Sequence, residues 1–291
     1  GGKVAKMSGR GLGHTGGTID KLESIQGLST TISPEKFAEF VNQNGMCVIG
    51  QSKGLVPADK QLYALRDVTG TVDCMPLIAS SIMSKKLAGG ADIIILDVKY
   101  GSGSFMSTRK KAEELAKLMV GIGTAAGKKV SAVITDMDTP LGHNVGNLLE
   151  VAEAVEVLKG GGDSDLREVC YMLVKQMLLH AGYTDAEADK AIRKSVESGS
   201  ALQKLADTVR LQGGDLSWIL DTDKIPKASY QLTVTAEKDG YIRKTDTKLI
   251  GEAAMLLGAG RAVLEDQIDP CAGLTMLKKT GDRVQRGEPL A

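Results

Sequence analysis

The segment from Lys6 to Glu23 reads KMSGRGLGHTGGTIDKLE and places a glycine-rich turn between a short extended run and a helical pattern. Glycines let a backbone approach a phosphate closely, and hydroxyl groups donate hydrogen bonds to its oxygens. The amides at the start of a helix add the positive end of a dipole. The glycine spacing differs from that of the dinucleotide fingerprint, and no GKS or GKT follows as in a P-loop. The segment therefore predicts a strand, an anion-binding turn and a helix, with a purely structural turn as the alternative.

Outward from this segment, short apolar runs alternate with longer helical patterns. The runs cover 47–51, 92–98 and 129–136, which is the order expected of a parallel sheet with crossover helices. Two of them are apolar on both faces, as in the interior of an α/β sandwich. We predict helices over 15–24, 34–44, 57–69, 75–88, 108–126, 144–158, 164–181 and 185–211.

The alternation of strand-like runs with helical patterns is interrupted at two places along the chain. Two helical patterns over 57–88 follow each other without a strand, which indicates a separate helical lobe facing the sheet across a cleft. From about residue 231, short alternating runs and turn residues indicate a small domain rich in hairpins. The fold class is therefore α/β, a parallel or mixed sheet flanked by helices, with part of a helical lobe and a small C-terminal α+β domain. We expect four segments: 1–56 and 89–230 as the two parts of the α/β lobe, 57–88 as the helical-lobe segment, and 231–291 as an incomplete barrel-like domain.

Composition narrows the class of function. The chain has 291 residues, of which 42% are hydrophobic, and its 36 basic and 36 acidic residues cancel. Such a balance gives no overall field that would attract nucleic acid or an anionic membrane, so we expect neither as a partner. The four cysteines are far apart and form no CxxC pair, which favours reduced thiols in a cytoplasmic protein. No apolar run approaches the roughly 20 residues of a membrane span.

The glycine-rich segment resembles a family signature. From Ser8 to Glu23 the chain meets every fixed position of the pattern S-G-R-G-L-x-x-T-x-G-T-x-D-x-x-E, which is similar to that of the thymidine and pyrimidine-nucleoside phosphorylases. The resemblance continues through 58–69, 80–86, 96–99, 140–142, 146–147 and 258–261. It implies a fragment that lacks a leading segment and the extreme C-terminus, and we expect this chain to be inactive alone.

The resemblance also implies a site. Ser8 and Thr18 match the hydroxyl groups that bind phosphate in the family. The residues that match its base-binding positions are Leu12, Tyr63, Arg66, Ser81, Ile82 and Lys85. Helical spacing agrees independently with this set, because Tyr63 and Arg66 are three residues apart and Ser81 and Lys85 are four apart.

The implied reaction is phosphorolysis of uridine, thymidine or deoxyuridine to the free base and α-(deoxy)ribose 1-phosphate. Phosphate attacks the sugar directly, so the protein would be a glycosyltransferase of the pentosyltransferase class without an organic cofactor. Negative charge grows on the leaving base, and Arg66 and Lys85 can stabilise it. Ser81 would hydrogen-bond the base at N3. Members of the family are typically homodimers that act in nucleotide salvage.

Several alternatives stay open. The chain could be a thymidine-specific phosphorylase, an anthranilate-type phosphoribosyltransferase, or a non-catalytic binding or scaffold protein. Taken alone, Arg66 and Lys85 are ordinary charges on helix surfaces. The family resemblance further implies a cation site, in which Leu141, Asn144 and Glu153 supply oxygen ligands to a monovalent ion such as potassium. Glu153 could instead be an acidic residue facing the N-terminal dipole of its helix.

Overall fold

The structure is a computed structural model that describes residues 2–11, 15–50, 56–71, 74–263 and 265–291, apart from the side chains of residues 60, 63, 64 and 66–68. Its longest strands form two parallel pairs. Strand β1 (Val4–Ser8) pairs with β2 (Met46–Gly50), and β3 (Ile93–Tyr100) pairs with β4 (Lys129–Asp136). The predicted strands and their parallel direction are thus confirmed. Within the described residues the two pairs are separate sheets.

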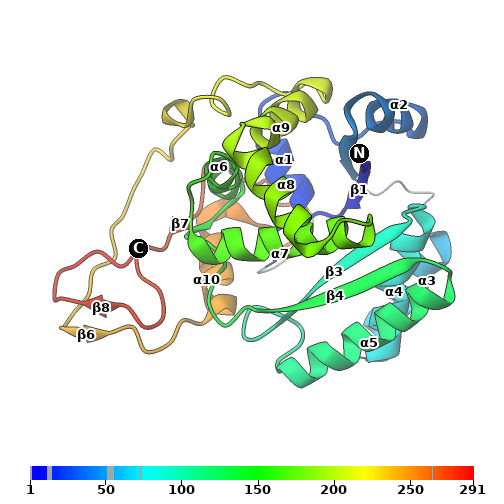
Figure 1. The fold of residues 1–291 in the computed structure, drawn as a ribbon. Helices are drawn as coiled ribbons and strands as arrows, with labels where there is room; N and C mark the ends of the chain where they lie inside the picture. The colour runs from blue at the N-terminus through cyan, green and yellow to red at the C-terminus, as the bar shows by residue number, and fades with distance from the viewer. Residues whose placement is uncertain (1, 12–14, 51–55, 72–73, 264) are drawn as a thin grey trace.

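The β3–β4 pair is covered by helices on both faces (Figure 1). Helices α4 (Met75–Ala88) and α5 (Arg109–Ala125) lie on one face, and α7 (Ser164–His180) lies on the other. The apolar side chains of both strands therefore find partners, and Met83, Leu96 and Met119 are buried in this core. Gly123 in α5 faces the Val130 side chain so closely that a Cβ could not fit between them.

A second core lies beneath the glycine-rich turn. It joins α1 (Thr18–Glu23), α6 (Asn147–Leu158) and α9 (Ser200–Leu211), and its centre consists of Ile25, Leu148, Val155, Val209 and Trp218. Helix α2 (Pro34–Asn44) begins at Ser33, whose hydroxyl accepts a hydrogen bond from the Lys36 amide, and packs against β2. The helix that follows the glycine-rich turn, α1, is thus packed against α6 in this core.

The prediction of a single helix over 185–211 is wrong. Helix α8 (Asp185–Glu197) and α9 are separate, and between them Gly199 has a φ of +72°. A helix cannot continue through the left-handed region, which glycine enters at little cost. The predicted start of α8 is confirmed, because Thr184 and Glu187 form a reciprocal capping box.

The remaining elements are short. Helix α3 (Pro57–Thr69) precedes α4, and α10 (Thr247–Ala254) lies near two antiparallel pairs, β5 (Asn144–Val145) with β7 (Leu274–Thr275) and β6 (Gly240–Tyr241) with β8 (Arg283–Val284). Two further turns of helix cover Thr222–Lys224 and Met255–Ala259.

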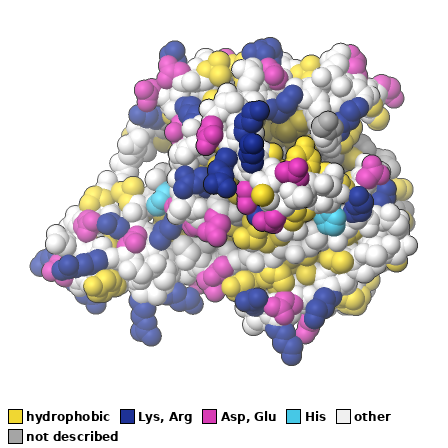
Figure 2. All heavy atoms as spheres, in the orientation of Figure 1, with side chains coloured by type: hydrophobic (Ala, Val, Ile, Leu, Met, Phe, Trp, Pro, Cys, Tyr) yellow, Lys and Arg dark blue, Asp and Glu magenta, His cyan; other side chains and the backbone are white. Residues whose placement is uncertain are grey.

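The predicted strand-like run over 231–236 pairs only in its second half, where an antiparallel bridge joins Thr235 to Pro289 and the Ala236 amide donates to the Glu288 carbonyl at 2.9 Å. Ala236 is buried there, whereas the Leu232 side chain, ahead of the paired part, is 89% exposed. None of the described helices is long and apolar enough to cross a membrane. Basic and acidic side chains are interspersed over the visible face, in agreement with the balanced charge (Figure 2).

Candidate active site

The glycine-rich turn brings the two predicted phosphate-binding residues to its two ends. Ser8 is the last residue of β1, opposite Gly50, and Thr18 is the first residue of α1. The Ile19 amide donates to the Gly9 carbonyl at 3.5 Å, so both hydroxyl residues flank one backbone contact. Both are partly buried. The strand, turn and helix predicted from the sequence are therefore confirmed as a local unit.

The described part of the turn folds back on itself so tightly that Gly11 and Gly17 are required. A Cβ on Gly11 would overlap the Thr15 carbonyl, and one on Gly17 would overlap the Gly11 amide. No side chain caps the start of α1 at Gly17. This close approach of backbone to backbone explains Gly11 and Gly17 without any ligand.

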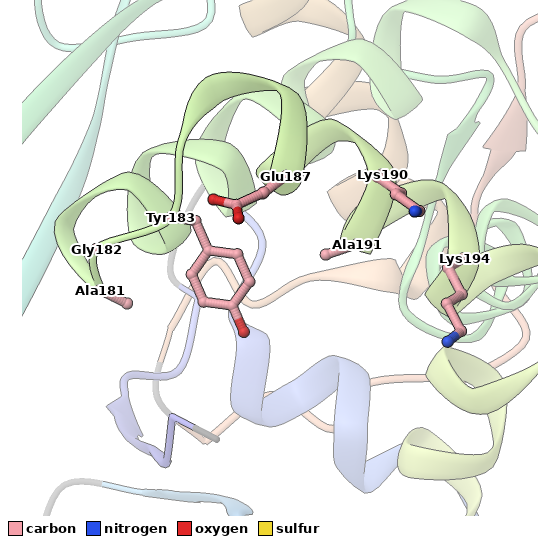
Figure 3. Close-up of a pocket in the computed structure, with 7 residues that line it drawn as sticks. All are labelled: Ala181, Gly182, Tyr183, Glu187, Lys190, Ala191 and Lys194. Atoms are coloured by element: carbon pink, nitrogen blue, oxygen red, sulfur yellow. The ribbon is translucent and has the colours of Figure 1, made fainter.

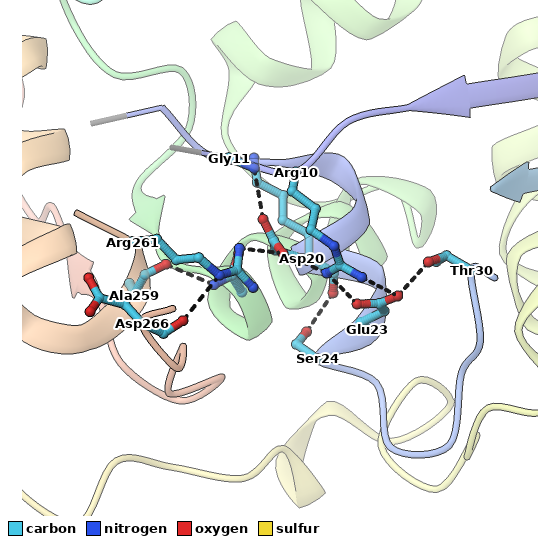
Figure 4. A network of polar contacts seen from close by, with 11 residues as sticks. Arg10, Gly11, Asp20, Glu23, Ser24, Thr30, Ala259, Arg261 and Asp266 are labelled. Atoms are coloured by element: carbon cyan, nitrogen blue, oxygen red, sulfur yellow. Dashed lines mark hydrogen bonds and ion pairs between the residues drawn. The ribbon is translucent and has the colours of Figure 1, made fainter. Parts of the chain in front are cut away.

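A network of charged side chains lies beside the turn (Figure 4). The Asp20 side chain, only 3% exposed, accepts hydrogen bonds at Oδ1 from Arg10 at 3.0 Å and from Arg261 at 2.8 Å. Its Oδ2 accepts the Gly11 amide at 2.8 Å. Arg10 also donates to Glu23 at 2.6 Å, and this hydrogen bond raises the pKa of Arg10 despite the opposing effect of burial. Arg10 is thus held as a cation that faces two carboxylates.

Among the residues predicted to bind the base, Ser81 and Lys85 share one face of α4, as their spacing predicts. The Lys85 Nζ lies 3.1 Å from the Ser81 Oγ, and Ser81 is buried. Asp59 of α3 forms an ion pair with Lys85 at 2.7 Å, a contact that the sequence analysis did not foresee. Ile82 packs against the core under β3 and β4.

Part of the predicted base site cannot be placed. Leu12 lies outside the described residues, and the side chains of Tyr63 and Arg66 lie outside the described part of α3. Their convergence with Ser81 and Lys85 on one ligand stays a prediction.

The predicted cation-binding residues lie together around one loop. Glu153, buried in α6, accepts the His143 amide at 2.7 Å and the Asn144 amide at 3.3 Å. Leu141 begins the same loop, in which Gly142 approaches the Glu153 carboxylate so closely that a Cβ would overlap it. Glu153 therefore acts as an anchor for the loop, and the described residues contain no group of three or more metal-binding side chains of the His, Cys, Asp or Glu type.

A second charged cluster ties the C-terminal segment to the same loop. Lys279 pairs with Asp163 at 2.8 Å and with Asp165 at 2.6 Å, and Asp163 lies 2.6 Å from the His143 ring. Burial raises the pKa of Asp163, but the hydrogen bonds from Lys279 and from the Asp165 backbone outweigh it. They hold the pKa of this carboxyl far below its ordinary value.

Cavities occur elsewhere on the surface. One of about 420 Å³ lies at the turn between α7 and α8, with Tyr183, Glu187 and Lys194 on its walls (Figure 3). None of the sequence-predicted site residues lines it. Another, of about 460 Å³, adjoins the Asp20 network and is lined by Arg10, Asp20 and Arg261 among others.

The sequence analysis missed the roles of Asp20, Glu23, Asp59 and Arg261. Asp20 and Glu23 are fixed positions of the signature, and their spacing of three on α1 puts them on one face. Arg261 follows them by more than two hundred residues, and no local pattern could connect it to the turn.

Comparison with known proteins places this site in a family. Residues 1–202 match the model described as "Glycosyl transferase family, a/b domain", and 241–291 match "Pyrimidine nucleoside phosphorylase C-terminal domain". The chain is 54% identical to the pyrimidine-nucleoside phosphorylase of Bacillus subtilis (strain 168) and 52% identical to that of Geobacillus stearothermophilus. The corresponding enzyme of Staphylococcus aureus (strain USA300) is 51% identical. Each match covers 99% of this chain and 67% of the relative. On the strength of these matches and of the signature around Ser8 and Thr18, the chain belongs to the pyrimidine-nucleoside phosphorylase family.

Proposed function

We propose that this protein catalyses phosphorolysis of pyrimidine nucleosides, including uridine and thymidine, to the free base and α-(deoxy)ribose 1-phosphate. The observation that carries the proposal is the glycine-rich turn, in which Ser8 and Thr18 flank a single backbone contact at an uncapped helix start. The relatives that match nearly the whole chain are named for this activity.

Phosphate lies at the turn, where the Ser8 and Thr18 hydroxyl groups donate to its oxygens. One phosphate oxygen forms a bond to the anomeric carbon as the bond from that carbon to the base nitrogen breaks. The base leaves with both electrons of the broken bond, so its carbonyl oxygens gain negative charge. Because phosphate is itself the nucleophile, positioning supplies much of the rate and inversion gives the α-phosphate.

The leaving base is stabilised from α3 and α4. Lys85 and Arg66 face the developing anion, and Ser81 hydrogen-bonds N3, with Tyr63, Ile82 and Leu12 around the ring. The contact between Lys85 and Ser81 at 3.1 Å supports this assignment, since one base edge can reach both. Asp59 keeps Lys85 oriented and compensates its charge before the base arrives. Fixed charges of this kind are usually the largest single contribution to such catalysis.

Inorganic phosphate is the co-substrate and no organic cofactor takes part. A monovalent cation such as potassium binds the carbonyl oxygens of Leu141 and Asn144 and the Glu153 carboxylate, which are hard oxygen ligands gathered around one loop. The enzyme acts in the cytoplasm as a homodimer formed through the helical lobe.

Calorimetry and product analysis test the activity. We expect inorganic phosphate and uracil to bind, and uridine and thymidine to release base only when phosphate is present. Binding of phosphoribosyl pyrophosphate would favour an anthranilate-type transferase instead. Binding of none of these ligands would favour a scaffold, and turnover of thymidine without uridine would favour the thymidine-specific enzyme.

A further inference from the structure

We propose that Asp20 and Arg261 form a brace that positions the glycine-rich turn for phosphate. Asp20 is a positioning residue, and its ion pair with Arg261 connects the turn to the C-terminal segment. The inference rests on the proposed function, because it takes the turn to be the phosphate site.

Asp20 contacts both the turn and its surroundings. One carboxylate oxygen accepts the Gly11 amide at 2.8 Å, and the other accepts Arg10 at 3.0 Å and Arg261 at 2.8 Å (Figure 4). Three donors thus converge on a side chain that is 3% exposed. A nearly buried carboxylate is costly without partners, so this arrangement holds only when the donors are in place.

The hydrogen bond from the Gly11 amide to Asp20 holds the turn between the two proposed phosphate-binding residues. Gly11 lies between Ser8 and Thr18 in the chain, and its amide points to Asp20. The Ser8 and Thr18 hydroxyl groups can converge on one phosphate only if the described ends of the turn, up to Gly11 and from Thr15, keep their positions. Because glycines offer little conformational restraint of their own, the restraint must come from outside the turn.

Arg261 is itself held rigidly. Its Nε donates to the Asp266 carbonyl at 3.2 Å, and the Asp266 carboxylate accepts the amides of Ala262 and Val263. The Arg261 side chain is only 16% exposed. On its N-terminal side, the Ala259 carbonyl accepts a hydrogen bond from Asn147 of α6 at 2.9 Å. These hydrogen bonds hold the loop around Arg261, so that its guanidinium group reaches Asp20 beside the glycine-rich turn.

Arg261→Gln tests the brace in the full-length protein, leading segment included, with steady-state kinetics measured separately for phosphate and for uridine. We expect the KM for phosphate to rise roughly 10-fold, as for the loss of a coupled contact, and the KM for uridine to change less than twofold. Arg261→Lys keeps the charge and should recover part of the phosphate affinity. Asp20→Asn should act in the same direction, and its effect should not add to that of Arg261→Gln because both variants disrupt the contact between Asp20 and Arg261.

Lys279→Gln is the matched control. Lys279 also joins the C-terminal segment to two carboxylates and is 17% exposed, but it does not touch the glycine-rich turn. Its loss should lower the melting temperature and leave the KM for phosphate unchanged. An equal rise in that KM for Lys279→Gln, or none for Arg261→Gln in a folded protein, would overturn the brace.

Ser8→Ala and Thr18→Ala separate this inference from the proposed function. If they raise the KM for phosphate while Arg261→Gln does not, the phosphate site stands and only the brace is wrong. If they leave phosphate unaffected, the phosphate site lies elsewhere and the assignment of the turn fails first.

Discussion

At the scale of single residues, the proposed function assigns phosphate binding to hydroxyl groups and stabilisation of the leaving base to cations. Lys85 is tied to Ser81 and Asp59 before any ligand arrives. Its proposed task belongs to the transition state, because the base carries its full negative charge only as it leaves. We expect Lys85→Ala to lower kcat about 100-fold, as for the loss of an oxyanion donor. Lys86→Ala, the next residue on α4, is the control for general damage. A raised KM with unchanged kcat would contradict the role.

The proposed phosphate-binding residues lead to a different expectation. In the proposed site, Ser8→Ala and Thr18→Ala would each remove a hydrogen bond to a charged ligand, which costs roughly 1.5–3 kcal/mol of binding free energy. Calorimetry should show weaker binding of phosphate and little change for uracil. Ser29→Ala, outside the turn, should change neither. Equal weakening of both ligands would mean that the substitutions disturb the whole site.

At the scale of elements, helix boundaries depend on backbone conformation as much as on pattern. Gly199 separates α8 from α9 with a φ of +72°, and nothing lies within 4 Å of the position of its missing Cβ. Gly199→Ala should therefore destabilise the protein by about 1–2 kcal/mol through backbone strain alone.

Gly121→Ala is the matched control, because Gly121 lies within α5 and also has open space around it. It should stabilise by about 0.5–1 kcal/mol, since alanine favours the helix. Urea unfolding of the two variants measures both changes. Effects of the same sign would show that local packing, rather than φ, decides these positions.

At the scale of the whole molecule, ion pairs connect the C-terminal segment to the α/β lobe at two places, Arg261 with Asp20 and Lys279 with Asp163. The pKa of Asp163 lies below its ordinary value of 3.8. Burial raises this pKa, but the hydrogen bonds to the carboxylate lower it by more. A lowered pKa gives a carboxyl a stabilising effect that is present above its unfolded pKa and is lost as the pH falls through the folded one.

Burial lowers the pKa of Lys279, but Asp163 and Asp165 raise it further, to a net value above 10.5. Its contribution is therefore full below pH 10.5 and is lost as the pH rises through the folded pKa. We expect stability to fall below about pH 4 and above about pH 10, with smaller losses at both ends in Lys279→Gln. Urea unfolding at pH 3, 7 and 11 checks this. An unchanged pH dependence in the variant would assign the losses to other groups.

The sequence by itself determined the local units and the family. The spacing of apolar residues predicted most helices within a few residues, and β4 was predicted with its observed bounds. The observed caps at Ser33 and Thr184 are equally local. Such patterns are local, because helix and strand periods and capping hydrogen bonds involve neighbours in the chain. The signature from Ser8 to Glu23 predicted the strand, turn and helix for the same reason.

Only the tertiary structure decided which distant groups meet. Arg261 reaches Asp20, Asp59 reaches Lys85, and Lys279 reaches Asp163 across long stretches of chain. Tertiary structure also paired 234–236 with 287–291, two stretches that no local pattern in the sequence connects. These contacts depend on how the packed layers bring distant surfaces together. The sequence around a carboxylate does not show which distant cation will pair with it.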